Sequence, residues 1–268
     1  MTSALGSEAL LAPLRDDPAR AAILLDVDGT LAPIVEQPSQ AQVPASTREL
    51  LAELTQRYGL VACVSGRRAS EARAIVSIGS ITYLGSHGAE LLRAGWTEPV
   101  LDPRLENWAQ RIHDFGVQSD NPDLRRLRVR LEDKGAILAY HWRGSPDEDA
   151  ARAAIDAIAT RAQALGLRTH WGRKVLEVRP PVKFDKGTGV ANLLEGLDLE
   201  AAIYVGDDLT DVDAFRAIVR LAEEGRIARA IRVGVKSPEA PEEILGEADL
   251  LVDGPSGVSE LLSLLLVD

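Results

Sequence analysis

Cysteine is nearly absent from this sequence. The 268 residues contain a single one, Cys63, so the chain cannot form a disulfide with itself. Because free cysteines persist in reducing compartments, this favours an intracellular protein. Cys63 stands within an apolar run at residues 60–64. We expect it to be a small, buried core residue, since free cysteine is among the most buried residue types.

Aromatic residues and positive charge are also scarce. Aromatics make up 4% of the chain, and the net charge is −11. Proteins that bind single-stranded nucleic acid use aromatic side chains for stacking, and both nucleic acids and acidic membrane surfaces attract basic proteins. We therefore exclude nucleic acids and membranes as partners. A small anionic ligand would need a local positive group or a metal ion to overcome the overall negative field.

Long hydrophobic runs are missing as well. No stretch approaches the roughly 18 apolar residues of a membrane-spanning helix. The N-terminal residues lack the basic start and apolar segment of a signal peptide. The hydrophobic fraction of 46% is ordinary for a soluble globular protein. We expect a cytoplasmic monomer.

The sequence does contain short apolar runs separated by amphipathic segments. Runs that end in polar clusters begin near residues 21, 60, 201 and 230, and their length and composition indicate buried parallel strands. Helical periodicity lies between them, over residues 46–59, over residues 186–199 and from residue 257. This alternation predicts an α/β fold with a doubly wound, mostly parallel, Rossmann-like core sheet.

The middle of the chain has a different pattern. Apolar and charged residues alternate from Leu127 to Glu132, which is typical of a half-exposed antiparallel strand. A helix is expected to begin near Ser145 or Pro146, and a later strand should stop at the prolines of residues 180 and 181. We predict an inserted α+β cap domain. The predicted division is a core of residues 1–103 and 182–268 and a cap of residues 104–181.

Polar residues gather where the apolar runs end. In an open α/β sheet the carboxyl ends of parallel strands share one edge, and ligands bind there. Clustered carboxylates repel one another unless a cation lies among them, and oxygen ligands without His or Cys favour magnesium. Each group alone has a plainer reading, because Asp-Gly and Ser-Gly are common turns and acids are common at helix starts. The strand-end residues are Asp26 and Asp28; Ser65, Gly66 and Arg67; Asp207 and Asp208; and Lys236.

The order DVDGT, VSGR, DKG and GDD resembles the four motifs of the haloacid dehalogenase-like phosphohydrolase superfamily, over the whole α/β core. The resemblance implies that Asp26 is the nucleophile that becomes an aspartyl phosphate, and that Asp28 is the general acid and then the base. It implies that Ser65 and Lys186 bind the phosphoryl group; Lys183 is nearby, but Lys186 precedes the glycine. Mg²⁺ would be held by Asp26, the backbone carbonyl of Asp28 and Asp207. The supporting positions are Gly29, Thr30, Gly66, Arg67, Asp208 and Asp211.

Three further segments resemble trehalose-6-phosphate phosphatases. They are SHGAE at residues 86–90, LEDKGAILAYHWR at residues 131–143 and RKVLEVRPP at residues 173–181. The resemblance implies that Glu132, Lys134 and Glu177 hydrogen-bond sugar hydroxyls. The other implied substrate-binding residues are His87, His141 and Arg143. Each of these could instead be a solvated charge on an exposed strand or a structural histidine.

The function predicted from these patterns is magnesium-dependent hydrolysis of trehalose 6-phosphate, a small-molecule sugar phosphate. Two other interpretations remain open. The same chemistry could act on sucrose phosphate, a glycosyl phosphoglycerate or a hexose phosphate, because those enzymes share the core motifs and differ in the cap. A phospho-accepting signalling domain also clusters acids, a hydroxyl residue and a lysine around magnesium, although such domains are shorter and uncapped.

Overall fold

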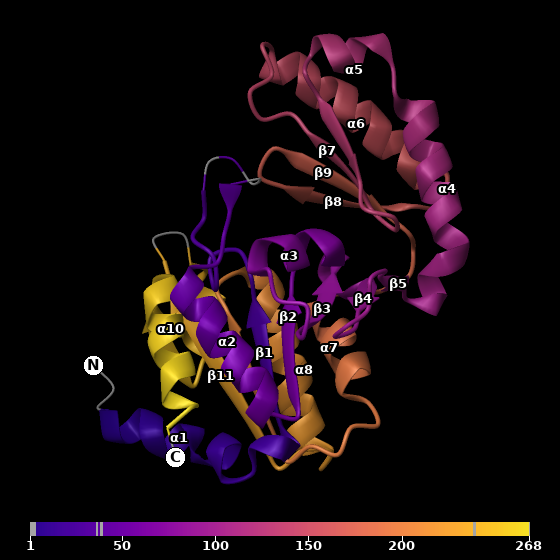
Figure 1. Cartoon of the computed structure of the whole chain (residues 1–268). Coiled ribbons are helices and arrows are strands. Elements are labelled where there is room, and N and C mark those ends of the chain that lie inside the picture. Colours follow the sequence, from indigo (N-terminus) through magenta and orange to yellow (C-terminus); the bar gives the residue numbers. More distant parts are fainter. Residues whose placement is uncertain (1–3, 36, 38–39, 238–239, 268) are drawn as a thin grey trace. The chain divides into compact units, whose positions relative to one another are not determined.

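The computed structural model describes residues 4–35, 37, 40–237 and 240–267. The chain divides into two compact units, one of Met1–Val100 with Phe184–Asp268 and the other of Leu101–Lys183 (Figure 1). These divisions lie within a few residues of the predicted junctions at Pro103 and at residues 181 and 182. The separate roles expected of the two units, as catalytic core and as cap, stay a prediction.

The first unit is built on one large sheet. Within the described residues, eight strands follow the order β12-β11-β10-β1-β2-β3-β4-β5. All neighbours from β12 to β3 pair in parallel, and β4 is antiparallel to β3. The mostly parallel sheet expected from the sequence is therefore confirmed. The strands are β1 (Ala21–Asp26), β2 (Leu60–Val64), β3 (Thr82–Gly85), β4 (Glu90–Leu92), β5 (Val100–Leu101), β10 (Ala201–Gly206), β11 (Arg229–Lys236) and β12 (Leu250–Asp253).

The central strand β1 shows why both faces of this sheet carry helices. Every residue of β1 is buried, and its side chains alternate between two apolar clusters. Ile23 and Leu25 belong to one cluster, with Cys63, while Ala22 and Leu24 belong to the other. The first cluster is completed by α1 (Ala4–Asp16), α2 (Ala45–Arg57), α3 (Ala69–Val76) and α10 (Gly254–Leu264). The second is completed by α7 (Lys186–Leu194), α8 (Leu209–Glu223) and α9 (Glu242–Glu247).

The second unit has its own sheet and its own core. Its strands pair antiparallel in the order β6-β7-β9-β8. Side chains from one face of the sheet, among them Leu138 and Leu176, pack with Ile112 and Ile155 from the helices. The elements are α4 (Pro103–Ser119), α5 (Pro122–Arg126), β6 (Arg130–Asp133), β7 (Leu138–His141), α6 (Glu148–Ala164), β8 (Arg168–Gly172) and β9 (Val175–Arg179).

Two boundaries predicted in this unit are wrong. The strand expected from Leu127 begins only at Arg130, because Leu127 is the C-cap of α5 and Arg128 has a left-handed φ of +54° that interrupts an extended chain. The helix expected near Ser145 begins at Glu148. Asp147 caps it, since the Asp147 side chain accepts a hydrogen bond from the Ala150 backbone N–H at 2.9 Å.

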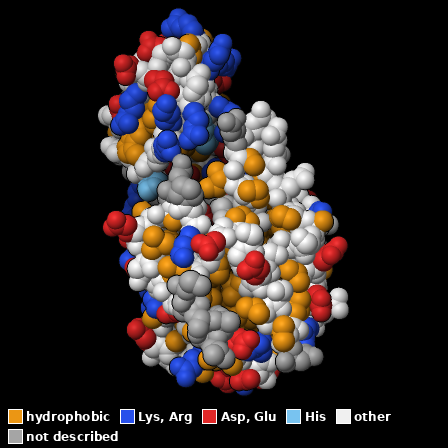
Figure 2. All heavy atoms as spheres, turned by 90° about the vertical axis from the view of Figure 1, so that its left-hand side faces the viewer, with side chains coloured by type: hydrophobic (Ala, Val, Ile, Leu, Met, Phe, Trp, Pro, Cys, Tyr) orange, Lys and Arg blue, Asp and Glu red, His pale blue; other side chains and the backbone are white. Residues whose placement is uncertain are grey.

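Basic side chains are concentrated in the second unit. That unit is less than a third of the chain, yet it contains half of the 30 Lys and Arg residues. Figure 2 shows Lys and Arg side chains gathered on its visible face. Its exposed arginines include Arg125, Arg126, Arg128, Arg130, Arg143, Arg168 and Arg173. The excess of negative charge in the chain therefore belongs to the first unit.

In the described part of the chain, every helix is too short or too polar to cross a lipid bilayer.

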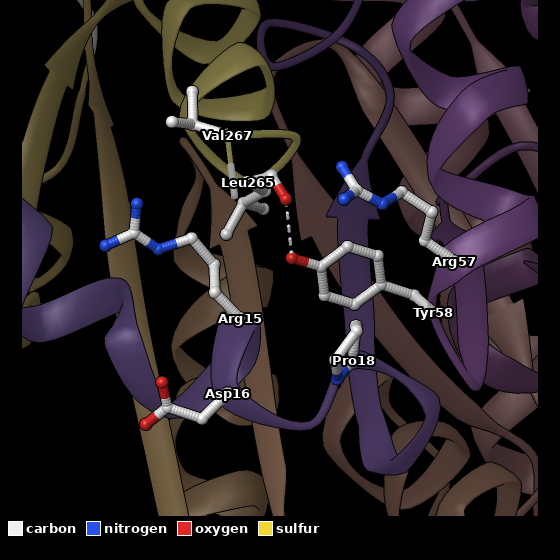
Figure 3. Close-up of a pocket in the computed structure, with 7 residues that line it drawn as sticks. All are labelled: Arg15, Asp16, Pro18, Arg57, Tyr58, Leu265 and Val267. Atoms are coloured by element: carbon white, nitrogen blue, oxygen red, sulfur yellow. Dashed lines mark hydrogen bonds between the residues drawn. The ribbon is translucent and has the colours of Figure 1, made fainter.

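The end of α10 is fastened to the end of α2, just before β2. The Tyr58 hydroxyl donates a hydrogen bond to the backbone carbonyl of Leu265 at 2.8 Å, and Arg57 donates one to that of Leu266. A cavity of about 210 Å³ lies beside these bonds (Figure 3). Leu265 is the C-cap of α10, so the Tyr58 hydroxyl satisfies a carbonyl that the helix itself leaves open. The cavity is lined by Arg15, Asp16, Pro18, Arg57, Tyr58, Leu265 and Val267.

Glu90 of β4 fixes the start of α3. Its buried carboxylate accepts a hydrogen bond from the backbone N–H of Ala69 at 2.9 Å and pairs with the Arg68 guanidinium at 3.3 Å. Gly85 permits this approach, because a Cβ there would lie 2.1 Å from the Ala69 nitrogen. The turn between β2 and α3, which carries the VSGR motif, is thereby tied to β3 and β4.

We expect Glu90→Ala to lower the free energy of unfolding by about 1–3 kcal/mol, because it leaves the buried Ala69 N–H without its acceptor. Glu90→Gln keeps an amide oxygen at that place and should lose less. Urea unfolding of the three proteins measures the difference. Equal losses in the two variants would show that the charge of Glu90, and not its hydrogen bond to Ala69, holds the turn.

Candidate active site

Three neighbouring strand ends bring the core motifs together. In the sheet order β10-β1-β2, Leu25 is paired with Val205 and Asp26 with Val64. The residues that follow β10 and β2 are Asp207 and Ser65, so they lie at the same edge as Asp26. Carboxylate oxygens of Asp26, Asp207 and Asp211 all lie within 4.8 Å of one another, and all three residues are buried.

Lys186 lies inside this cluster. Its Nζ donates hydrogen bonds to Oδ1 of Asp26 and to Oδ1 of Asp211, both at 2.7 Å. The side chain of Asp185 caps α7 by accepting the Thr188 N–H at 2.7 Å, which makes Lys186 the first residue of the helix. Lys183, the other lysine of this segment, is exposed and lies in the second unit.

The charges of the cluster do not balance within the chain. Burial by itself lowers the pKa of Lys186, but Asp211 and Asp26 outweigh it and raise that pKa well above its ordinary value. Burial raises the pKa of Asp26 well above its ordinary value, against the opposing charge of Lys186. Burial and the charges of Asp211 and Asp208 raise the pKa of Asp207 to about 7. One ammonium group therefore serves several carboxylates, and a second cation would relieve the remaining repulsion.

Two positions without side chains make room for these carboxylates. Gly29 has a φ of +91°, and a Cβ there would lie 2.1 Å from Oδ2 of Asp207. A Cβ at Gly206 would lie 2.3 Å from Cγ of Asp211. Thr30 is fully buried and donates its hydroxyl to Oδ1 of Asp207 at 3.1 Å. The DVDGT turn and the GDD turn therefore pack directly against each other, and glycine at positions 29 and 206 leaves the space that this packing needs.

Asp28 is oriented differently from Asp26. Its carboxylate is bound by both sides of the Arg67 guanidinium, with Nε to Oδ2 at 2.7 Å and Nη2 to Oδ1 at 2.6 Å. The buried Ser65 turns back on the same loop, because its Oγ accepts the Arg67 backbone N–H at 3.1 Å. This pairing joins the first motif to the second and keeps the Asp28 side chain near the half-exposed rim of the cluster.

His87 belongs to the first unit, beside the second motif. Its backbone N–H donates to the Ser65 carbonyl at 3.1 Å, and its ring lies 2.8 Å from where a Cβ on Gly66 would be. Both Ser86 and His87 have left-handed φ values, of +50° and +57°. The SHGAE segment is therefore packed against the VSGR loop.

Lys236, at the carboxyl end of β11, lies apart from this cluster. Lys236 ends β11 and is half exposed, and its ammonium group lies 3.7 Å from the Asp253 carboxylate. Asp208 caps α8 by accepting the Thr210 N–H at 2.7 Å, and Lys186 Nζ lies 3.9 Å from it. The cluster thus comprises Asp26, Lys186, Asp207 and Asp211, with Asp208 at its border.

Two of the predicted sugar-binding residues, Glu132 and Glu177, lie in one row across the sheet of the second unit. Strand register pairs Glu132 with Ala139 and Ala139 with Glu177, and His170 follows on β8. Alternation along the strands puts this row on the face opposite the apolar core. Both acids have cationic or histidine partners. His141 Nε2 lies 2.8 Å from Glu132, Lys134 Nζ lies 3.6 Å from Glu177, and Arg179 Nε donates to Glu177 at 2.9 Å.

The remaining predicted residue, Arg143, is exposed in the turn after β7 and lies outside this row. Reasoning from the sequence also missed several residues that the structure brings to the two clusters. Arg179 is part of the quoted LEVRPP segment and could have been found from it. Glu90 ends the SHGAE segment. Tyr204 and His170 carry no comparable signal, because a tyrosine in an apolar strand predicts only core.

Comparisons with known proteins cover most of this chain. The model of the trehalose-phosphatase family covers residues 24–242. Trehalose-phosphate phosphatase of Mycobacterium marinum is 34% identical over an alignment of 250 residues that covers 85% of this chain and 61% of that protein. Trehalose-phosphate phosphatase B of Arabidopsis thaliana is 29% identical over 261 residues, covering 91% of this chain and 66% of that protein. An uncharacterized glycosyl hydrolase of Mycobacterium tuberculosis is 35% identical over 221 residues, covering 78% of this chain but 16% of that protein. This chain therefore spans less than two thirds of the length of these relatives.

Solved structures share the fold. The C-terminal domain of Candida albicans trehalose-6-phosphate phosphatase has a TM-score of 0.72 and 22% identity, with 100% of both chains covered. A haloacid dehalogenase-like hydrolase from Bacteroides thetaiotaomicron has a TM-score of 0.60 and 17% identity, covering 91% of this chain and 98% of that one. These likenesses support the α/β core and the second unit as one known architecture.

The row in the second unit generates a prediction about pH. The hydrogen bond from His141, followed by the charge of Lys134, lowers the pKa of Glu132 from 4.5 to about 2. A carboxyl with a lowered pKa in the folded state stabilises the fold fully above its ordinary pKa and loses that contribution as pH falls through about 2. We expect wild type to lose stability relative to Glu132→Gln as pH is lowered from 5.

Urea unfolding at a series of pH values, down to the lowest at which wild type stays folded, measures this difference. The control is Glu106→Gln, an exposed position on α4, whose curve should run parallel to that of wild type. A Glu132→Gln curve that also ran parallel would contradict the role given to the His141 hydrogen bond.

Proposed function

This chain belongs to the trehalose-phosphatase family, and from that premise we propose that it is a magnesium-dependent phosphatase that hydrolyses trehalose 6-phosphate to trehalose and phosphate. The observation that carries the proposal is the buried cluster in which Lys186 joins Asp26 to Asp211 beside Asp207. Such a cluster holds a carboxylate nucleophile next to fixed positive charge. It is suited to phosphoryl transfer, which depends on positioning and on neutralising negative oxygens.

The residues fit a divalent metal ion. Carboxylate oxygens of Asp26 and Asp207 lie within 4.8 Å of each other, and no nitrogen or sulfur ligand is needed. Burial, followed by the charges of Asp211 and Asp208, raises the pKa of Asp207, and a cation beside it would offset this. Asp26, Asp207 and the backbone carbonyl of Asp28 would hold Mg²⁺, which prefers oxygen ligands. When bound, the ion would offset negative charge on the phosphoryl oxygens.

The proposal gives each of the chain's own residues a role. One oxygen of Asp26 accepts the Lys186 hydrogen bond, and the other attacks phosphorus to form an aspartyl phosphate as the bond to the sugar oxygen breaks. Asp28 gives a proton to that leaving oxygen. Asp28 then takes a proton from water, and the resulting attack on phosphorus releases phosphate and restores the Asp26 carboxylate. Arg67 holds Asp28 at the rim, and the Ser65 hydroxyl binds the phosphoryl group.

We assign sugar recognition to the row on the second unit. Glu132 and Glu177 are held as charged acceptors by their partners, which leaves them able to receive hydrogen bonds from neutral hydroxyls. Lys134, His141 and Arg143 complete the proposed group on that unit. The gathering of Lys and Arg on that unit supplies the local positive charge that an anionic sugar needs against the net charge of −11. His87 is assigned to the phosphate end, because it lies beside Ser65.

Phosphate release from a panel of phosphomonoesters, with Mg²⁺ and with a chelator, tests the proposal. We expect many turnovers per enzyme on trehalose 6-phosphate with Mg²⁺, slower release from sucrose phosphate and hexose phosphates, and none with chelator. A preference for another sugar phosphate would keep the chemistry and overturn the substrate. A single stable phosphorylation without turnover would favour a phospho-accepting signalling domain instead.

Asp26→Asn should lower kcat by at least about 1,000-fold, because an amide is a poor nucleophile for phosphorus. Phosphate release and urea unfolding measure activity and folding separately, and we expect the variant to remain folded. Asp17→Asn serves as the control, since Asp17 is an exposed acid in the turn before β1, and its kcat should equal that of wild type. An Asp26→Asn enzyme that retains near wild-type activity would remove Asp26 from the nucleophile's role.

The double variant Glu132→Ala, Glu177→Ala should lower kcat/KM on trehalose 6-phosphate by about 30-fold or more, since two hydrogen bonds of about 1 kcal/mol each are lost. Hydrolysis of a small aryl phosphate should be unchanged, because the core residues are untouched. Glu106→Ala with Asp149→Ala removes two exposed acids from the helices of the same unit and should change neither substrate. Equal losses on both substrates would mean that the two glutamates support folding or chemistry and do not recognise the sugar.

A further inference from the structure

Tyr204 is a fully buried tyrosine whose hydroxyl enters the carboxylate cluster. It lies in β10, three residues before Asp207, and its hydroxyl donates a hydrogen bond to Oδ1 of Asp211 at 2.7 Å. Its ring meets the ring of Phe215 of α8 edge to face, with centroids 5.9 Å apart. Tyr204 therefore points from the sheet toward α7 and α8, the two helices that carry Lys186 and Asp211.

All acceptor positions of the Asp211 carboxylate are occupied by hydrogen-bond donors of the chain itself. Its Oδ1 accepts from the Tyr204 hydroxyl and from Lys186 Nζ, each at 2.7 Å. Its Oδ2 accepts from the backbone N–H groups of Asp207 and Asp208, each at 3.1 Å. An ionised carboxylate offers about four lone-pair sites, so Asp211 acts as an anchor for its neighbours and has no site left for a ligand.

Lys186 is shared equally between two carboxylates. Its Nζ lies 2.7 Å from Oδ1 of Asp26 and 2.7 Å from Oδ1 of Asp211. The Tyr204 hydroxyl occupies one lone pair of that Asp211 oxygen and reduces the negative charge that Lys186 meets there. Without the hydroxyl, the oxygen would have an empty acceptor site in a buried place, and the nearest group with spare donors is the ammonium of Lys186.

We infer that Tyr204 is a positioning residue that keeps Lys186 between Asp211 and Asp26, so that part of the ammonium's charge stays at the nucleophile. The part of this inference that is tested by kcat rests on the proposed phosphatase function. The tyrosine itself touches neither substrate nor reacting atoms; it acts on Asp211, which acts on Lys186.

Tyr204→Phe tests the inference with little change in shape. We expect kcat on trehalose 6-phosphate to fall about 10-fold or more, because the hydrogen bond from Tyr204 to the Asp211 carboxylate is lost. KM should change less than about twofold. Tyr83→Phe is the matched control: Tyr83 is buried in β3 of the same sheet and donates its hydroxyl to the Ile78 carbonyl at 2.6 Å, in the other apolar cluster. Its kcat should stay at the wild-type value although it too loses a buried hydrogen bond. A Tyr204→Phe kcat equal to that of Tyr83→Phe would overturn the inference.

A double-mutant cycle with Asp211→Asn asks whether Tyr204 acts through Asp211. If it does, adding Tyr204→Phe to Asp211→Asn should leave kcat unchanged, because coupled residues are not additive. A further fall as large as that in wild type would overturn this route. Thermal unfolding identifies an Asp211→Asn protein that does not fold, and in that case the comparison of Tyr204→Phe with Tyr83→Phe decides alone.

Crystal structures of wild type and Tyr204→Phe give a readout that does not depend on activity. The distance from Lys186 Nζ to Oδ1 of Asp26 should lengthen from 2.7 Å in the variant. An unchanged distance would overturn the positioning role. If wild type hydrolyses no phosphomonoester at all, the proposed function fails, and this distance still tests the inference by itself.

Discussion

The ammonium group of Lys186, buried between Asp26 and Asp211, is the interaction on which the rest of the site depends. A buried cation without partners would be strongly destabilising, and so would the surrounding acids without the cation. The two hydrogen bonds connect three separate segments: the end of β1, the first turn of α7 and the first turn of α8. The glycines at positions 29 and 206 serve the same arrangement, because each leaves the space that a neighbouring carboxylate fills.

The surroundings of the carboxyl groups shift their pKa values in opposite directions in the two units. In the core, burial and mutual repulsion raise the pKa of Asp26 and Asp207, so these groups gain from any cation that arrives. In the second unit, Glu132 has a histidine and cations around it, and its pKa falls to about 2. The first arrangement suits metal binding and chemistry at phosphorus. The second suits constant, fully charged acceptors for hydroxyl groups.

Local patterns in the sequence were sufficient for the parallel core sheet and for the residues of its carboxyl edge, because buried strands and strand-end acids are visible in short windows. They failed where specific side-chain and backbone contacts of the folded chain decide the outcome. Residues 127–129 alternate as a strand does, yet the backbone of Val129 bonds to Leu124 and the strand starts later. In the sequence, Tyr204 cannot be told from any other core tyrosine, because its hydrogen bond to Asp211 of α8 is not visible there. In the same way, Glu90 cannot be told from any other strand acid, because its hydrogen bond to Ala69 at the start of α3 is not visible there. The hydrogen bond from Ala69 to Glu90 spans 21 residues, so a short window of sequence cannot show it.

The strand order also sets the sequence of events when the chain is made. The second unit is continuous, from residue 101 to residue 183, and its strands pair with near neighbours, so it can form as soon as it is synthesised. β1, the strand that ends at Asp26, pairs with the nearby β2 on one side, but its other partner, β10, lies about 180 residues further on. Contacts between distant residues form slowly, since the loop between them must close first. The edge that holds Asp26 and Asp207 can therefore be completed only after β10 has been made.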